Sequence, residues 1–197
     1  MDFEQSTRQY YADNASVFVE NTQNVDMSAL YERFLPYIPE QGSILDAGCG
    51  SGRDAKHFQS LGHQVAAFDA SPELAELAGQ LLQQPVSIQT FQQFDKADAY
   101  DGIWCCASLL HVPNSELLDV IKRLHKALKQ SGVLYMSFKY GTQERVKEGR
   151  FFCDQNEQTI QSYLAGFKVL ETWVTGDQRP DRESEQWLNL IVQKQER

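Results

Sequence analysis

The chain has 197 residues, of which 42% are hydrophobic and 23% are charged, and this composition excludes disordered and fibrous proteins. One hydrophobic core is expected at this length, because cores rarely divide below about 250 residues. The formal net charge of −9 disfavours a bulk nucleic-acid substrate, because an acidic chain repels phosphate backbones.

The first expected elements in chain order are helices. Apolar residues that include Tyr10 and Tyr11 recur at helical spacing and predict a helix over residues 5–23. A second helix is expected over residues 27–35, with Asp26 as its N-cap and prolines beyond its end.

Strands and helices alternate through the middle of the chain. We predict strands over residues 43–47, 64–68, 86–90, 100–106 and 133–139. Helices are expected between them over residues 53–61, 71–82 and 116–129. Such alternation with short connections predicts a parallel sheet covered by helices on both faces.

The last part of the chain has a different pattern. A helix is expected near residues 157–164, followed by strands over 167–175 and 185–193 that a polar loop joins. Two successive strands joined in this way form an antiparallel hairpin. The predicted fold is therefore α/β, a doubly wound and mostly parallel seven-stranded sheet with a C-terminal antiparallel hairpin.

The most specific motif in the sequence is a glycine loop between the first predicted strand and the helix after it. The strand ends at Asp46 and Ala47, and glycines follow at every second position, as Gly48, Gly50 and Gly52. Glycines let the backbone turn tightly and let a ligand approach it, and the helix N-terminus offers free N–H groups. The third glycine comes one residue earlier than in the G-x-G-x-x-G pattern of dinucleotide-binding proteins.

An acidic residue, Asp69, stands at the end of the second predicted strand. In doubly wound nucleotide-binding folds a carboxylate at this position accepts hydrogen bonds from ribose hydroxyls. The alternative is that Asp69 only caps the following helix.

Four landmarks in chain order resemble the motifs of the class I S-adenosylmethionine-dependent methyltransferases, of the standalone small-molecule type. They are the glycine loop of residues 46–52, the acidic turn of residues 69–73, the strand and loop of residues 100–113, and the LKQSGVL turn of residues 128–134. The resemblance implies one domain over residues 1–197, with N-terminal helices in 1–40, a cofactor-binding core in 43–139 and an acceptor side in 140–197.

The resemblance also implies S-adenosylmethionine as cofactor, with S-adenosylhomocysteine as product, and it supplies candidate contacts. These are Tyr11, Asp46, Ala47, Gly48, Cys49, Gly50, Arg53, Asp69, Ala70, Ser71, Thr90, Phe91, Cys106, Ala107 and Ser108. The family often has an acidic residue after the third strand to bind adenine, but residues 89–93 contain none. Adenine would be held by a backbone carbonyl, by Gln92 or by stacking on Phe91.

Three of the other candidates have two interpretations each. Arg53 pairs with the cofactor carboxylate or faces solvent, and Tyr11 closes over the cofactor or belongs to the core. His111 follows the fourth strand, where it could remove a proton from the acceptor or could merely shape its loop. Aromatic and basic residues near the later strand ends suggest an acceptor pocket: Lys139, Tyr140, Phe151, Phe152, Arg179 and Trp187.

The resemblance implies in-line transfer of a methyl group to an unidentified small-molecule acceptor. A sulfonium methyl group is already activated, so positioning and exclusion of water matter most and no base is required. Two alternatives stay open: a non-catalytic S-adenosylmethionine-binding regulatory protein, and an NAD-dependent oxidoreductase.

The sequence gives only general indications of where the protein is located and how it assembles. No apolar run approaches the roughly 20 residues of a membrane span, and the first residues do not read as a signal peptide. The four cysteines lack metal-ligand spacing, so reduced thiols and no metal are expected. We expect a cytoplasmic monomer or homodimer without membrane or nucleic-acid partners.

Overall fold

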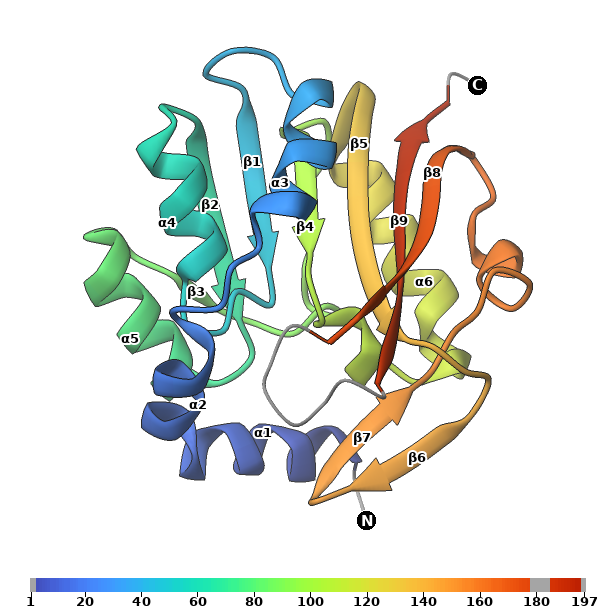
Figure 1. Ribbon diagram of the computed structural model, residues 1–197. Coiled ribbons are helices and arrows are strands. Elements are labelled where there is room, and N and C mark those ends of the chain that lie inside the picture. The colour runs from blue at the N-terminus through green and yellow to red at the C-terminus, as the bar shows by residue number, and fades with distance from the viewer. Residues whose placement is uncertain (1–2, 178–184, 196–197) are drawn as a thin grey trace.

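A seven-stranded sheet forms the centre of the molecule (Figure 1). The computed structural model describes residues 3–177 and 185–195. The strand order is β3-β2-β1-β4-β5-β9-β8. The strands are β1 (Ser43–Ala47), β2 (Gln64–Asp69), β3 (Ser87–Ile88), β4 (Tyr100–Cys105), β5 (Leu128–Lys139), β8 (Phe167–Gly176) and β9 (Gln186–Lys194). The first five pair in parallel, whereas β9 runs antiparallel to both β5 and β8, which confirms the predicted fold.

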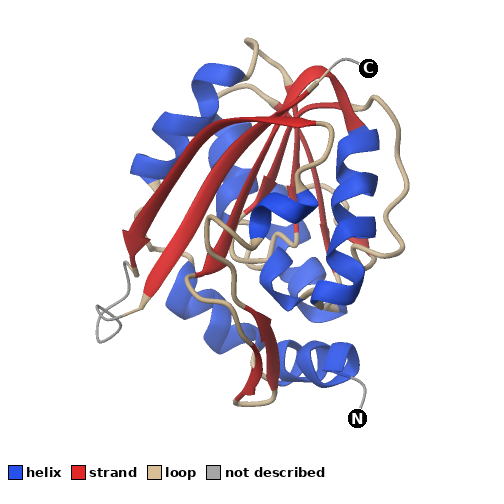
Figure 2. Cartoon of the chain, turned by 90° about the vertical axis from the view of Figure 1, so that its right-hand side faces the viewer, coloured by secondary structure: helices blue, strands red, loops and turns tan. Residues whose placement is uncertain are grey.

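Helices cover both faces of this sheet (Figures 1 and 2). They are α1 (Phe3–Asp13), α2 (Ala15–Thr22), α3 (Ser28–Phe34), α4 (Arg53–Ser60), α5 (Pro72–Leu82) and α6 (Asn114–Ala127), with 3-10 turns η1 (Leu35–Tyr37), η2 (Leu109–His111) and η3 (Ile160–Tyr163). The start of α5 follows from its sequence, because the Ser71 hydroxyl caps the Leu74 N–H and Pro72 suits the first turn.

The core lies on both sides of the sheet because successive strand residues point to opposite faces. Ile103 and Leu134 pack in a cluster with the apolar face of α6. Their neighbours Trp104 and Tyr135 stack at 3.9 Å between ring centroids and pack with Phe34 of α3. The alternation of residues along β4 and β5 thus builds two separate clusters.

The N-terminal prediction of one helix over residues 5–23 is wrong in one respect, because the helix breaks between α1 and α2. The break is at Asn14, whose side-chain amide donates to the Tyr10 carbonyl at 2.8 Å. Asparagine competes for backbone groups in this way, which favours an interruption. Asp26 also differs from its expected N-cap role, since it accepts from the Ser28 N–H and Met27 is the capping residue.

The C-terminal part contains an element that the sequence pattern did not predict. Strands β6 (Glu144–Lys147) and β7 (Arg150–Cys153) form a separate antiparallel hairpin. Its turn places Glu148 and Gly149 at positive φ, as the tight turns of hairpins require. The expected helix over residues 157–164 is only the 3-10 turn η3, and the expected strand over 86–90 is reduced to β3.

The hairpin and the N-terminal helices gather at one end of the sheet. In Figure 1 the parallel strands point downward, and α1, α2 and the β6–β7 hairpin lie below their carboxyl ends. Ligands of doubly wound sheets bind at that end, where the strand order reverses. No helix in the described part of the chain is long and apolar enough to span a membrane.

Candidate functional site

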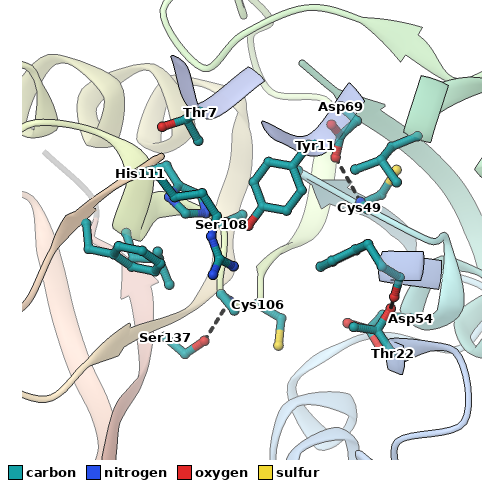
Figure 3. A pocket seen from close by; sticks show the side chains of 18 of the residues that line it. Thr7, Tyr11, Thr22, Cys49, Asp54, Asp69, Cys106, Ser108, His111 and Ser137 are labelled. Atoms are coloured by element: carbon teal, nitrogen blue, oxygen red, sulfur yellow. Dashed lines mark hydrogen bonds between the residues drawn. The ribbon is translucent and has the colours of Figure 1, made fainter. Parts of the chain in front are cut away.

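A cleft of about 290 Å³ opens at the carboxyl ends of the parallel strands. All but two of the predicted cofactor contacts line it, together with His111: Tyr11, Gly48, Cys49, Gly50, Arg53, Asp69, Ala70, Ser71, Thr90, Phe91, Cys106, Ala107, Ser108 and His111. Side chains from the two ends of the chain meet here. Figure 3 shows Tyr11 of α1 between Asp69 on one side and His111 on the other.

The glycine loop forms one wall of the cleft and is closely packed on both sides. All three of its glycines have positive φ, at +73° for Gly48, +53° for Gly50 and +77° for Gly52. A Cβ at Gly48 would lie 2.6 Å from the Ser108 Cβ, and one at Gly50 would lie 2.9 Å from the Phe18 ring. Glycine is therefore required both for backbone conformation and for close approach.

Asp69 joins the ends of β1 and β2. Its carboxylate accepts from the Gly50 N–H at 2.8 Å and from the Ser71 N–H at 2.9 Å. Burial raises the pKa of Asp69, although these backbone hydrogen bonds act in the opposite direction. A carboxylate can accept about four hydrogen bonds, so Asp69 retains capacity for ligand donors. It also holds the glycine loop in place, in addition to ribose binding and helix capping, the two roles that the sequence suggested.

The two predicted contacts that do not line the cleft are Asp46 and Ala47. Asp46 is buried and accepts from the Ala55 N–H in the first turn of α4, at 3.0 Å. Burial and repulsion by Asp54 raise its pKa well above the usual range. The Ala47 carbonyl accepts from the Ser108 hydroxyl at 2.7 Å. Both residues therefore bind neighbouring parts of the protein, α4 and Ser108, and stabilise the cleft without lining it.

Arg53 lines the cleft, but its guanidinium is engaged within the protein. It donates to both carboxylate oxygens of Asp54, at 2.6 and 3.1 Å, and to the Thr22 carbonyl of α2 at 2.9 Å. Asp54 also accepts from the Tyr31 hydroxyl and the Trp104 indole N–H. This buried network ties α2, α3 and α4 together beneath the glycine loop. Asp54 adjoins the glycine motif in sequence, a signal that could have identified it.

The wall that follows β3 contains Thr90, Phe91 and Gln92. The Phe91 ring packs edge-on against Phe68, with 5.3 Å between the ring centroids. The Gln92 side chain donates to Glu116 of α6 at 2.7 Å. Of the candidates for binding an adenine ring, the geometry therefore favours Phe91 over the Gln92 amide.

The loop after β4 forms the opposite wall. Ala107 has φ of +51°, and its N–H donates to the Ser137 hydroxyl of β5 at 2.8 Å (Figure 3). Burial, followed by the charge of Asp54, raises the pKa of the Cys106 thiol to about 12. Cys106 is therefore protonated at neutral pH and unsuited to act as a nucleophile.

His111 makes a hydrogen bond with each of its ring nitrogens. Nδ1 lies 2.6 Å from the Phe151 carbonyl, and Nε2 lies 2.9 Å from the Tyr11 hydroxyl. A carbonyl can only accept, so Nδ1 carries the proton and Nε2 accepts from Tyr11. Burial, reinforced by the charge of Arg150, lowers the pKa of His111 to about 4. The imidazole is thus neutral at pH 7, and the lone pair on Nε2 already accepts the hydrogen bond from Tyr11.

The side of the cleft beyond β5 contains part of the expected acceptor group. Lys139, Phe152 and Trp187 line it, whereas Tyr140 and Phe151 do not. Arg179 lies outside the described residues. Sequence reasoning missed four basic residues that also line the cleft. They are Arg8 of α1, and Arg145, Lys147 and Arg150 of the β6–β7 hairpin, which it did not predict.

Among residues 3–177 and 185–195, no three His, Cys, Asp or Glu side chains come together as a metal ion would require.

Comparisons with known proteins place this arrangement in a family. A family model described as a methyltransferase domain matches residues 18–167. The ubiquinone biosynthesis O-methyltransferase of Xanthomonas campestris pv. campestris is 31% identical over 101 residues, which cover 48% of this chain and 41% of that enzyme. The chain thus matches less than half of that relative's length.

Solved structures share the fold at lower identity. One is the 1,6-didemethyltoxoflavin-N1-methyltransferase of Burkholderia thailandensis, solved with 1,6-didemethyltoxoflavin and S-adenosylhomocysteine. Its TM-score is 0.77 at 20% sequence identity, and the match covers 99% of this chain and 90% of that one. The [4+2]-cyclase SpnF has a TM-score of 0.71 at 16% identity, and the match covers 96% of each chain. The same architecture thus supports different chemistries, and the reaction must be argued from the site.

Proposed function

The chain belongs to the class I S-adenosylmethionine-dependent methyltransferase family, and from this premise we propose that its cleft binds S-adenosylmethionine and transfers the methyl group to a small-molecule acceptor. When bound, the cofactor supplies a methyl group on positively charged sulfur, which needs no further activation. The protein's own task is then to bind, to orient the two reactants and to exclude water.

The observation that carries the proposal is the joint geometry of the glycine loop and Asp69. Gly48 and Gly50 line the cleft and carry no side chain, so a ligand can approach their backbone directly. Asp69 presents a carboxylate to the same cleft, and its remaining lone pairs match two ribose hydroxyls. These residues fit the cofactor, with Phe91 available for stacking against the adenine.

The N-terminal helices would cover the reactants. Tyr11 and Phe18 line the cleft and pack edge-on at 5.3 Å between ring centroids. His111 fixes the Tyr11 hydroxyl through Nε2. We therefore propose that His111 orients Tyr11 at the reaction centre, because an imidazole with a pKa of about 4 is a weak base at neutral pH.

The two halves of the cleft suggest a division of tasks along the chain. Residues 43–139 would bind the cofactor, and the segment from residue 140 onward would form most of the acceptor side. The net charge of −9 favours a small molecule over nucleic acid as acceptor. All four cysteines are free thiols, which suits a reducing compartment such as the cytoplasm.

Isothermal titration with S-adenosylmethionine, S-adenosylhomocysteine and NAD, each tested separately, examines the cofactor assignment. We expect binding of the first two and none of NAD. Asp69→Asn removes acceptor capacity for ribose and should weaken S-adenosylhomocysteine binding roughly 10- to 100-fold, the range for hydrogen bonds to a charged group. Asp119→Asn, on the exposed face of α6, is the matched control and should leave binding unchanged.

Each outcome bears on the proposal. Binding of NAD alone, or of no ligand by a folded protein, would overturn it. Equal affinity of the Asp69→Asn and Asp119→Asn proteins would show that Asp69 is not a cofactor contact.

A further inference from the structure

The acceptor half of the cleft is basic, in a chain whose net charge is −9. Its basic lining residues are Arg8, Lys139, Arg145, Lys147 and Arg150, and its acidic ones are Asp177 and Glu185. Five cations against two carboxylates leave an excess of three positive charges among the lining side chains, which Asp154 beside Arg145 and Glu148 beside Arg150 reduce to one. A local field of this sign, opposed to that of the whole protein, favours an anionic ligand.

Most of these cations are already neutralised by neighbours. Lys139 pairs with Glu185 and Asp177, and Lys147 lies 3.7 Å from Glu185. Arg145 binds both carboxylate oxygens of Asp154, at 2.9 and 3.2 Å. Arg145, Lys139 and Lys147 are therefore poorly placed to be the main anion contact.

Arg150 differs from these residues because it is buried and only weakly neutralised. Its relative exposure is 9%. Its guanidinium lies 4.3 Å from the centroid of Tyr10 and 5.3 Å from that of Phe152. One N–H group donates to Glu148 at 2.9 Å, but that side chain is 60% exposed, so solvent screens its charge. Nε is buried without a hydrogen-bond partner among the residues that the structure describes.

The backbone beside Arg150 is fixed to the reaction centre. The Phe151 N–H donates to the Thr7 hydroxyl of α1 at 3.0 Å, and the Phe151 carbonyl accepts from His111. Through these two bonds β7 contacts both α1 and η2, the elements that carry Tyr11 and His111. Arg150 thus lines the cleft next to the Tyr11–His111 pair and is not a remote surface charge.

We propose that the methyl acceptor carries a carboxylate and that Arg150 is its binding residue. This inference rests on the proposed function and specifies its substrate class. A buried guanidinium with an unpaired N–H is stabilised by an anion, and its planar fork matches a carboxylate. The rings of Tyr10 and Phe152 restrict the guanidinium, which reduces the entropy lost on binding.

The test compares carboxylates with their neutral amides, which have nearly the same shape. Benzoate with benzamide, and 4-hydroxybenzoate with 4-hydroxybenzamide, are titrated by ligand-observed NMR with and without saturating S-adenosylhomocysteine. We expect each carboxylate to bind at least about tenfold more tightly than its amide, the usual effect of a charge-assisted hydrogen bond.

Three variants assign this preference to Arg150. Arg150→Gln should reduce the ratio of carboxylate to amide affinity to about one, and Arg150→Lys, which keeps the charge but loses the fork, should give an intermediate ratio. Arg33→Gln, the same substitution at a partly exposed pair with Glu171, should leave the ratio unchanged. Thermal unfolding and S-adenosylhomocysteine affinity identify any variant that has not folded.

The outcomes separate this proposal from the one on which it rests. If neither carboxylate binds, if amides bind equally well, or if folded Arg150→Gln keeps the preference, Arg150 is only a structural clamp between two rings and the proposal is wrong. Failure of S-adenosylhomocysteine to bind would instead overturn the cofactor assignment. The ratio of carboxylate to amide affinity, measured without S-adenosylhomocysteine, would still test the role of Arg150.

Discussion

The two halves of the cleft are built by different means. The cofactor half consists mainly of backbone at the ends of neighbouring parallel strands, with glycines where side chains would collide. The acceptor half consists of side chains from β5, β8, β9 and a separate hairpin, with Arg8 of α1. A backbone site depends on conformation and tolerates few substitutions, whereas a side-chain site can change its ligand by exchanging residues.

The two halves also differ in charge. Asp54 and Asp69 outweigh Arg53 in the cofactor half, whereas basic residues are in excess beyond β5. The positive sulfonium of the cofactor would then lie in the acidic half of the cleft, and an anionic acceptor would lie in the basic half. The following substitutions test this division, in order of decreasing expected effect.

Gly48→Ala should damage the cofactor half most. Alanine at a φ of +73° is strained, and its Cβ would lie 2.6 Å from that of Ser108. We expect roughly 3–5 kcal/mol of lost stability, from left-handed strain and overpacking together, and loss of S-adenosylhomocysteine binding. Urea unfolding and calorimetry measure these effects.

Gly149→Ala is the matched control for the glycine loop. Gly149 has the same left-handed backbone, with φ of +77°, but a Cβ added there would have no atom within 4 Å. Strain alone, about 1–2 kcal/mol, should remain, and S-adenosylhomocysteine should still bind. Equal losses in the two variants would mean that close packing at Gly48 is unimportant.

Asp54→Asn tests the buried network under the glycine loop. Burial alone would raise the pKa of Asp54, but Arg53, Tyr31 and Trp104 together lower it below its usual range. Neutralising the carboxylate leaves Arg53 unpaired in a buried site, so roughly 3–4 kcal/mol of stability should be lost in urea unfolding. Asp95→Asn, at an exposed pair with Lys126, should change stability little, and similar losses in both would contradict the role of burial.

His111 should make stability depend on pH where the two halves meet. Its pKa is about 4 in the folded protein and 6.5 when unperturbed, so the unfolded chain binds the proton first. Stability contributed by the neutral histidine is therefore present above pH 6.5 and is lost as pH falls from 6.5 to 4. The loss reaches about 3 kcal/mol at the lower end.

Urea unfolding of the wild type and of His111→Gln between pH 7 and 4 measures this dependence. The variant should show a flatter profile, because the other titrating groups, including Asp46 and Asp69, are common to both proteins. Parallel profiles would show that the pKa of His111 is not lowered.

Thr7→Val should have the smallest effect, on the acceptor half alone. Valine has nearly the volume of threonine but leaves the buried Phe151 N–H without its acceptor, at a cost of about 1–2 kcal/mol. Loosening β7 should also reduce the carboxylate preference assigned to Arg150. Thr172→Val, at an exposed strand position, is the control, and an equal loss there would remove the hydrogen bond as the cause.

The sequence by itself determined the sheet, its antiparallel end and the glycine loop. These features depend on residues close together in the chain: the three glycines follow a strand directly, and Asp69 ends the next strand. In a parallel sheet those ends must lie side by side, so local pattern was sufficient.

Only the tertiary structure decided the acceptor side. Arg150 reaches the cleft because an unpredicted hairpin packs on α1, through a bond between Phe151 and Thr7 that spans 144 positions. His111 could be read as a base from its position, but its two hydrogen bonds and its burial give it a neutral form with no free nitrogen. Contacts over such separations depend on packing and desolvation, which sequence spacing does not encode.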